Sequence, residues 1–381
     1  MDYTRPDIVS GTTKLDKPFF ENLFDGIDDR PTREEANDTY APIRSTGSVL
    51  PKGTLARRYE KPIRLAVFSD SRGEGYTHDL SEGVTSWADT FPIRLAREMR
   101  ASLGLPTGGR GWIPLTLTGT ADDYRFSVSE FITGGKDLVI GDTGVPGSQW
   151  MTEAKTIRIP LSPGCTSIDF VSAGAGSGFG PKMTGQSGVV AELGHDGSQA
   201  VYLDALVNPG EYVDITSGGG GYFALGVIEY CGDETAGVQV LNFSVSGIDS
   251  VDMADHLTKP AMAGLLDWYG ADVSVVALGA NDLDHGLATA ASVTAMTSIL
   301  AASGGIPVAV TAIPAGPDGP PWVALNTAIR GLDATIADIA ADLPASDSPD
   351  ADGLFLTDGT HLTLSGNVAF GDDLRAFLIG R

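Results

Sequence analysis

Apolar side chains recur with the period of a helix near the start of the chain. The run from residue 86 to 104 places large apolar side chains four positions apart and ends at a glycine, which predicts one helix with a single buried face. This face consists of Trp87, Phe91, Leu95 and Met99, and Gly104 ends the run. Ahead of it, residues 63–68 form a short apolar run of strand length that is followed at once by a turn. The pattern predicts a strand, a turn and a helix in this order.

The last part of the chain alternates between strand-like and helix-like patterns. The predicted strands are residues 238–245, 272–279 and 306–314. The predicted helices are residues 250–270, 288–303 and 322–343, with a last helix after Thr363. Such a βαβ rhythm predicts a parallel sheet that is covered by helices on both faces.

Residues 106–237 have a different character. Short strand-like segments are separated by glycine-rich turns, and no convincing helix interrupts them. The predicted strands are residues 155–161, 166–172, 199–207, 211–217 and 222–230. Regularly spaced short strands are typical of a β-sandwich or jelly roll. We therefore expect an all-β insertion, 106–237, within an α/β domain made of residues 63–105 and 238–381, after an N-terminal docking or oligomerisation segment, 1–62.

Composition and charge narrow the class of protein. The 381 residues carry a net charge of −24, which disfavours nucleic acid as a partner. The acidity is concentrated, with 15 acidic against 6 basic residues in 106–237 and 17 against 4 in 238–381. No apolar run reaches the roughly 20 residues that span a bilayer, and the N-terminus does not resemble a signal peptide. Cys165 and Cys231 could form at most one disulfide and fit no metal-ligand spacing.

Polar residues suited to acyl transfer follow the predicted strands, where open α/β sheets place their sites. Ser71, at a strand-to-helix turn, is placed to be a nucleophile. His361 lies three residues after Asp358, so that the carboxylate could orient the ring while the ring acts as general base. The backbone N–H groups of Ser71 and Gly247 and the side-chain amide of Asn281 would form an oxyanion hole. The alternatives are a helix N-cap for Ser71, a surface residue for His361 and a turn former for Asn281.

These residues, in this chain order, resemble the SGNH (GDSL-type) hydrolase family. The resemblance covers residues 63–105 and 238–381, and it departs from the family pattern at Ser69, where the first motif has glycine. The matching positions are Asp70, Ser71 and Gly75 in block I, Gly247 in block II, Gly279, Asn281 and Asp282 in block III, and Asp358 and His361 in block V. The resemblance implies a three-layer α/β/α sandwich and a serine esterase that needs no metal or organic cofactor; we expect Asp282 to be structural.

Two further resemblances bear on where such an enzyme works. Relatives that remove acetyl groups from cell-wall or capsular polysaccharides sometimes carry a β-sandwich between blocks I and II, so 106–237 is expected to hold a glycan. A structural or oligomerisation role is the alternative. Segments of 1–62, TKLDKPFFENLFDGIDD and ANDTYAPI, resemble connector sequences of bacteriophage tail proteins. This implies a virion protein that acts at the host surface beside other tail proteins and is compatible with a homotrimer; otherwise we expect an extracellular enzyme.

The sequence thus predicts an esterase that removes O-acetyl groups from a bacterial surface glycan. Two alternatives stay open, namely a lipase or mycolyl-type esterase acting on envelope lipids, and an inactive receptor-binding or structural tail protein. Arg72 and His285 are candidates for contact with the substrate, against the alternatives of a solvated turn residue and a plain loop histidine. Trp112 and Trp150 are either sugar-stacking platforms or core residues.

Overall fold

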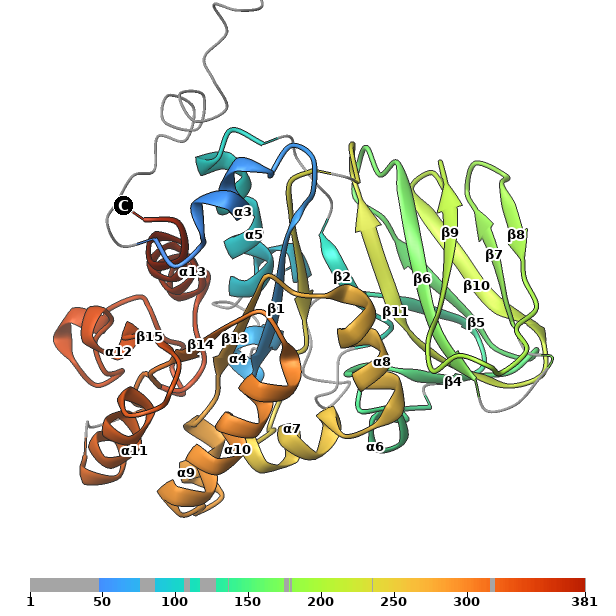
Figure 1. Cartoon of the computed structure of the whole chain (residues 1–381). Coiled ribbons are helices and arrows are strands. Elements are labelled where there is room, and N and C mark those ends of the chain that lie inside the picture. The colour runs from blue at the N-terminus through green and yellow to red at the C-terminus, as the bar shows by residue number, and fades with distance from the viewer. Residues whose placement is uncertain are drawn as a thin grey trace, which may run out of the picture. The chain divides into compact units, whose positions relative to one another are not determined.

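Five parallel strands form the sheet that positions the candidate site (Figure 1). The computed structural model describes residues 48–75, 86–105, 110–116, 128–135, 137–174, 178, 180–234, 236–315 and 319–380. The strand order is β12 (Val238–Asn242), β1 (Ile63–Ser69), β13 (Val273–Ala277), β14 (Ile306–Val310) and β15 (Thr335–Ala337). All four pairings are parallel. The central strands are apolar over most of their length because both faces of the sheet are covered.

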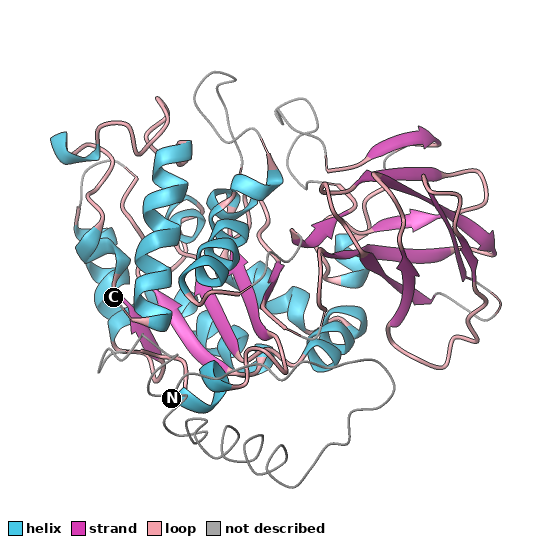
Figure 2. Ribbon diagram, turned by 90° about the horizontal axis from the view of Figure 1, so that it is seen from above, coloured by secondary structure: helices cyan, strands magenta, loops and turns pink. Residues whose placement is uncertain are grey.

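Helices lie on both faces of this sheet (Figure 2). Helix α5 packs against α13, whereas α10 packs against α7 and α11. Their bounds are α5 Phe91–Ser102, α7 Ser250–Leu257, α8 Pro260–Tyr269, α9 Ala280–Asp284, α10 Thr289–Ser303, α11 Pro320–Arg330, α12 Ile339–Asp342 and α13 Leu364–Ile379. None of the helices in the described part of the chain is long and apolar enough to cross a membrane.

The predicted helix face of residues 86–104 is confirmed, since all four of its apolar side chains are buried. Its first turn is a separate 3-10 helix, Trp87–Asp89 (η1), and α5 begins after it with a proline in its first turn. The predicted segment 1–62 lies outside the described residues up to residue 47. Beyond that point it contains helix α3 (Lys52–Ala56).

Two of the predicted helices are wrong in their extent. Residues 250–270 form α7 and α8 because Pro260 has no N–H to donate and instead occupies the first position of a new helix. Residues 322–343 are not one helix either. Helix α11 ends before Gly331, and residues 335–337 pair in parallel with β14 as the edge strand β15. The β-branched pair Thr335 and Ile336 favours this strand.

Between α5 and β12 the chain forms two antiparallel sheets, of order β3-β5-β10-β7-β8 and β2-β11-β6-β9, with β4 paired to β11. The five strands expected from the sequence are confirmed as β5, β6, β9, β10 and β11. The strand bounds are β2 Gly111–Pro114, β3 Glu130–Thr133, β4 Gln149–Met151, β5 Thr156–Pro160, β6 Ser167–Gly174, β7 Gly180–Gly185, β8 Val190–Glu192, β9 Tyr202–Val207, β10 Tyr212–Gly219 and β11 Tyr222–Tyr230. A short helix, α6 (Ile140–Thr143), appears where none was expected.

One of the two antiparallel sheets, β2-β11-β6-β9, shares a hydrophobic core with the α/β part. Phe243 lies 5.5 Å from Phe68 of β1 and 5.8 Å from Trp112 of β2, measured between ring centroids. Trp87 donates its indole N–H to the carbonyl oxygen of Trp112. The same buried cluster includes Val171, Leu225 and Ile228 of the antiparallel sheet and Met262 and Leu265 of α8. Residues Ser45–Arg381 accordingly form one compact unit, and whether 106–237 is a domain of its own, or a jelly roll, stays a prediction.

The two tryptophans differ in their surroundings. Trp112 is fully buried, which excludes it as a sugar-stacking platform and supports the core alternative. Trp150 is half-buried and packs edge-on against Phe223 at a centroid distance of 5.0 Å. Contact of Trp150 with a sugar stays a prediction.

We expect Phe243→Ala to lower the free energy of unfolding by about 3–5 kcal/mol, because it empties a fully buried ring site. Unfolding in urea, followed by circular dichroism and by tryptophan fluorescence, should remain one transition for both probes. The exposed Val207→Ala variant is the control and should change the free energy by less than about 0.5 kcal/mol. Two separate transitions, with only one of them moved by Phe243→Ala, would contradict a shared core.

Candidate active site

The candidate nucleophile lies on a short helix that directly follows strand β1. Helix α4 (Ser71–Glu74) is capped by Asp70, whose Oδ1 accepts the backbone N–H of Arg72 at 2.9 Å. A Cβ atom at Gly73 would collide with the side chains of Ser69 and Ser244. The turn therefore packs closely against the loop after β12, and only glycine fits at that position.

The structure brings Ser71, His361 and Asp358 together. Ser71 Oγ lies 2.9 Å from His361 Nε2, and His361 Nδ1 lies 2.8 Å from Asp358 Oδ2. Asp358 Oδ1 accepts the backbone N–H groups of Thr360 and His361 at 2.8 and 3.0 Å. The three side chains form one chain of hydrogen bonds in which the carboxylate fixes the ring and the ring faces the hydroxyl.

A short hairpin presents His361 to the end of β1. Phe355 and Leu362 form an antiparallel bridge, and the N–H of Leu356 donates to the His361 carbonyl at 2.8 Å. Helix α13 begins at Leu364, and Thr363 caps it by accepting the N–H of Gly366 with Oγ1. The backbone on both sides of His361 is therefore fixed.

The pKa of Asp358 lies well below the ordinary value for an aspartate. Burial acts to raise it, but the hydrogen bonds from the His361 ring and from the backbone N–H groups of His361 and Thr360 outweigh that effect. The carboxylate therefore stays ionised through the whole range in which the protein is expected to work. An ionised Asp358 is what a histidine that gains a proton during the reaction requires.

The segments that carry Gly247 and Asn281, two of the three predicted oxyanion-hole donors, also lie together. Gly247 has a φ of +77°, which favours glycine, and Asn281 Nδ2 donates to the Ile248 carbonyl at 2.8 Å. An amide carries two N–H groups, so this bond leaves the second one for a ligand. Asp282 is buried and accepts the N–H and the hydroxyl of Ser250 at 2.8 and 2.7 Å, as expected for a structural residue.

The sequence interpretation missed the polar residues that tie these segments to α4. Glu74 is buried and accepts the N–H of Ser246 at 2.6 Å. Asn242 donates its side-chain amide to the Gly73 carbonyl at 2.9 Å. Asn242 carries a signal in the sequence, since it is a polar residue within the apolar strand pattern of 238–245. Glu74 carries none, because it lies in a turn that is polar throughout. Together, Glu74 and Asn242 hold the Gly247 segment and the Ser71 helix in one fixed arrangement.

His285 forms a second pair with an aspartate beside this region. Its Nδ1 lies 2.9 Å from Asp249 Oδ2, and its side chain is 46% exposed. The hydrogen bond with Asp249 raises the pKa of His285. Contact of His285 with a substrate and the alternative of a plain loop histidine both stay predictions.

Arg72 is not placed as the sequence suggested. It is 6% exposed, and its guanidinium donates to the carbonyl oxygens of Thr360 and Ile313, each at 2.9 Å. The alternative of a solvated turn residue is wrong. Because the guanidinium faces backbone carbonyls inside the protein, contact of Arg72 with the substrate is not supported either.

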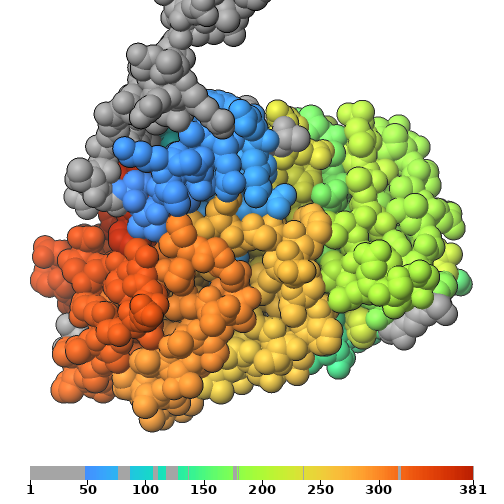
Figure 3. Space-filling view, viewed as in Figure 1, coloured from blue at the N-terminus to red at the C-terminus, as the bar shows by residue number. Residues whose placement is uncertain are grey.

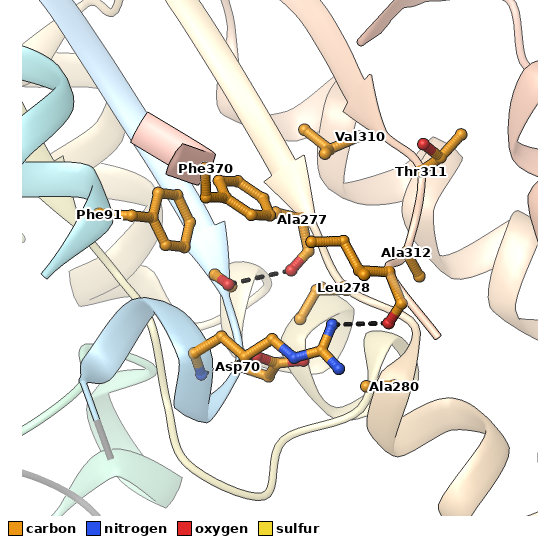
Figure 4. Close-up of a pocket in the computed structure, with 12 residues that line it drawn as sticks. Asp70, Phe91, Ala277, Leu278, Ala280, Val310, Thr311, Ala312 and Phe370 are labelled. Atoms are coloured by element: carbon orange, nitrogen blue, oxygen red, sulfur yellow. Dashed lines mark hydrogen bonds between the residues drawn. The ribbon is translucent and has the colours of Figure 1, made fainter. Parts of the chain in front are cut away.

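Figure 4 shows a cavity close to the Ser71 turn, lined by Asp70, Phe91, Leu278 and Phe370 among others. Its volume is about 10 Å³, which is enough for one water molecule. Ser71 and His361 do not line it, so it is not the site at which the hydroxyl meets a substrate. Among the described residues, no group of three or more His, Cys, Asp or Glu side chains is placed to hold a metal ion.

Comparisons with known proteins gave matches among solved structures alone. No protein-family model and no curated protein matches the sequence. A structure of TesA is 20% identical and covers 38% of this chain and 81% of its own, with a TM-score of 0.32. A putative lipolytic protein of the G-D-S-L family from Desulfitobacterium hafniense is 13% identical, covering 37% and 82% with a TM-score of 0.32.

A third structure covers more of this chain. It is a family two carbohydrate esterase from Clostridium thermocellum in complex with cellohexaose, 12% identical, covering 65% of this chain and 97% of its own with a TM-score of 0.27. The second of these neighbours is described as a lipolytic protein and the third as a carbohydrate esterase. TM-scores near 0.3 are too low to assign this chain a family, so its activity has to be inferred from its own residues.

The depressed pKa of Asp358 predicts a pH-dependent contribution to stability. The carboxylate stabilises the fold above the ordinary aspartate pKa of about 3.9, and this contribution is lost as the pH falls further through the folded-state value. We expect Asp358→Asn to be clearly less stable than the parent protein in denaturant titrations near pH 7. The difference should shrink as the pH drops below about 4. A difference that stays constant from pH 7 to pH 3 would show that the charge of Asp358 does not stabilise the fold.

Proposed function

We propose that the protein is a serine esterase that removes O-acyl groups, in the first place O-acetyl groups, from a bacterial cell-surface polysaccharide. The observation that carries the proposal is the hydrogen-bonded chain from Ser71 through His361 to Asp358, with distances of 2.9 and 2.8 Å. This geometry suits a hydroxyl that loses its proton to a ring whose other nitrogen is held by a carboxylate.

The reaction proceeds in two halves. Ser71 Oγ attacks the acyl carbonyl while His361 Nε2 takes its proton, and the imidazolium then gives that proton to the departing sugar hydroxyl. Water, activated by the same ring, attacks the acyl-Ser71 ester, and the proton passes back through His361 to Ser71 as the acid leaves. Asp358 stays ionised and stabilises the imidazolium in both halves.

Negative charge that develops on the carbonyl oxygen needs donors at that point. The backbone N–H groups of Ser71 and Gly247 and the free N–H of the Asn281 amide are the proposed donors. The bonds from Asn281 to Ile248 and from Ser246 to Glu74 support this assignment, because they hold the three segments together before a substrate arrives. Donors that are fixed in advance need no reorganisation during the reaction.

The choice of a polysaccharide is supported by the parts of the chain around the site. One of the two antiparallel sheets, β2-β11-β6-β9, shares its core with the α/β part, so the sheets would offer a long polymer a surface that is rigidly attached to the domain that carries the reacting groups. The net charge of −24 disfavours polyanions, so we propose a neutral or cation-bridged glycan. The likeness of residues 1–62 to phage tail connectors supports a place in a virion, acting at the host surface with other tail proteins.

Replacement of Ser71 tests the proposal. We expect Ser71→Ala to lower the hydrolysis of an activated acetyl ester by at least about 10³-fold, because the nucleophile is lost while the fold is kept. Ser69→Ala is the matched control in the same turn, since that hydroxyl donates to the Ala277 carbonyl and not to His361. It should keep activity within about tenfold. Equal activity of the Ser71→Ala and parent proteins would remove Ser71 from its role.

The same assay separates the alternatives. Acetyl release from isolated host envelope polysaccharide, together with weak turnover of long-chain acyl esters, is the expected result. Preference for long acyl chains would favour the lipase or mycolyl-esterase alternative instead. No turnover of any ester by the parent protein, combined with binding to host cells, would favour an inactive receptor-binding protein.

A further inference from the structure

The side chain of Arg72 connects the two halves of the candidate site. The residue follows Ser71 directly, and its backbone N–H is held by Asp70 Oδ1. Its Nε donates to the carbonyl oxygen of Thr360, the residue before His361. One side chain therefore runs from the helix that carries the proposed nucleophile to the hairpin that carries the proposed base.

The second donor of the guanidinium fixes a third segment. Arg72 Nη1 donates to the Ile313 carbonyl, in the loop that follows β14, at 2.9 Å, and this bond is drawn dashed in Figure 4. The planar guanidinium presents its N–H groups in a rigid fork, so binding one carbonyl sets the direction in which the other must lie. A lysine ammonium is a single point at the end of a flexible chain and would not hold both carbonyls in a fixed relation.

The burial of this charge needs a reason, since placing a guanidinium inside a protein is costly. Burial lowers the pKa of Arg72, and the carboxylates of Asp70, Asp284 and Asp358 act in the opposite direction. Among the described residues, no carboxylate forms an ion pair within 4.0 Å of the guanidinium nitrogens of Arg72, although Asp70 accepts its backbone N–H. The bonds that the guanidinium does make are to backbone carbonyls of segments beside the reacting groups.

Arg72 also lines a small cavity. Its Nη2 is buried with no hydrogen-bond partner among the described residues, and the cavity of about 10 Å³ is shared with apolar side chains such as Phe91 and Phe370. A cavity of this size has room for one water molecule. The bonds of the guanidinium to the protein are therefore the one from Nε to the Thr360 carbonyl, which sets the position of Thr360 relative to α4, and the one from Nη1 to the Ile313 carbonyl.

We propose that Arg72 is a positioning residue, which keeps Ser71 Oγ and His361 Nε2 within hydrogen-bond distance by fixing the Thr360 carbonyl relative to helix α4. This inference rests on the proposed esterase function. It predicts an effect on the chemical step rather than on substrate binding, because Arg72 faces the interior. Displacements of about 1 Å between reacting groups can cost about 10²-fold in rate.

Arg72→Lys and Arg72→Met test the proposal by steady-state kinetics on an acetyl ester. We expect kcat to fall by about 10–100-fold in both variants, with KM changed by less than about threefold. Thermal unfolding of each variant shows that it is folded at the assay temperature. If Arg72→Met does not fold, Arg72→Lys keeps the charge and still separates the outcomes.

Arg100→Lys is the matched control. Arg100 is 8% exposed and donates Nη1 to the Val238 carbonyl at 3.0 Å, at the opposite end of the sheet from the Ser71 turn. Its replacement should lower stability to a similar degree and leave kcat within about threefold. An equal loss of kcat in Arg100→Lys would overturn the proposal, because the effect would then be a general one.

Two other results would overturn the inference for Arg72 alone. If the Arg72→Lys protein has the kcat of the parent, the two-carbonyl binding by the guanidinium is not needed. If instead KM rises while kcat is unchanged, Arg72 contacts the substrate. A parent protein without esterase activity would instead overturn the proposed function, and the positioning role with it. The activity of the parent protein thus distinguishes the two failures.

Discussion

The hydrogen bond between Ser71 and His361 joins residues that are 290 positions apart. A contact at such a separation forms only when the elements that carry both residues are already in place. Here these elements are the end of strand β1 and the hairpin ahead of α13, and α13 in turn packs against α5. The site therefore depends on the complete α/β layer structure and not on any local segment.

Around that bond, buried polar groups rather than apolar contacts set the fine geometry. Glu74 and Asn242 hold the loop after β12 against α4, Asp282 holds Ser250, and Arg72 reaches from α4 to Thr360. Each of these groups is buried, and a buried polar group that loses its partner costs about 1–3 kcal/mol. Such a network stabilises one arrangement of the site residues relative to other conformations of the same segments. Figure 3 shows one face of the molecule in a space-filling view, in which the atoms of the antiparallel sheets adjoin those of the α/β part.

The sequence was most informative where residues suited to catalysis lie next to a segment whose apolar periodicity predicts a strand or a helix. Ser71, Asp358 and His361 could be named before the structure because each follows or precedes an element with a clear apolar pattern. The break between α7 and α8 at Pro260 was missed because the helical periodicity of 250–270 was followed across the proline. The edge strand β15 was missed because its three residues lie within a longer segment with helical periodicity. The burial of Arg72 could not be predicted, because it depends on Thr360 and Ile313, which are far away in the chain. Five β-strands of residues 106–237 were found from their alternation, whereas β2, β3, β4 and β8 have only three or four residues each. The six-residue strand β7 was missed as well, because its sequence GPKMTG holds two glycines and a proline and shows no clear alternation.

Covalent trapping of the nucleophile tests the central claim most directly. The protein is treated with an activated phosphonate ester, which reacts with a serine that has a base beside it, and intact-mass and peptide spectra locate the adduct. One adduct per chain on the peptide that contains Ser71 is predicted, with greatly slowed formation in His361→Gln. An adduct on another residue, or equal labelling of the His361→Gln protein, would contradict the assignment of Ser71, His361 and Asp358 as the reacting groups.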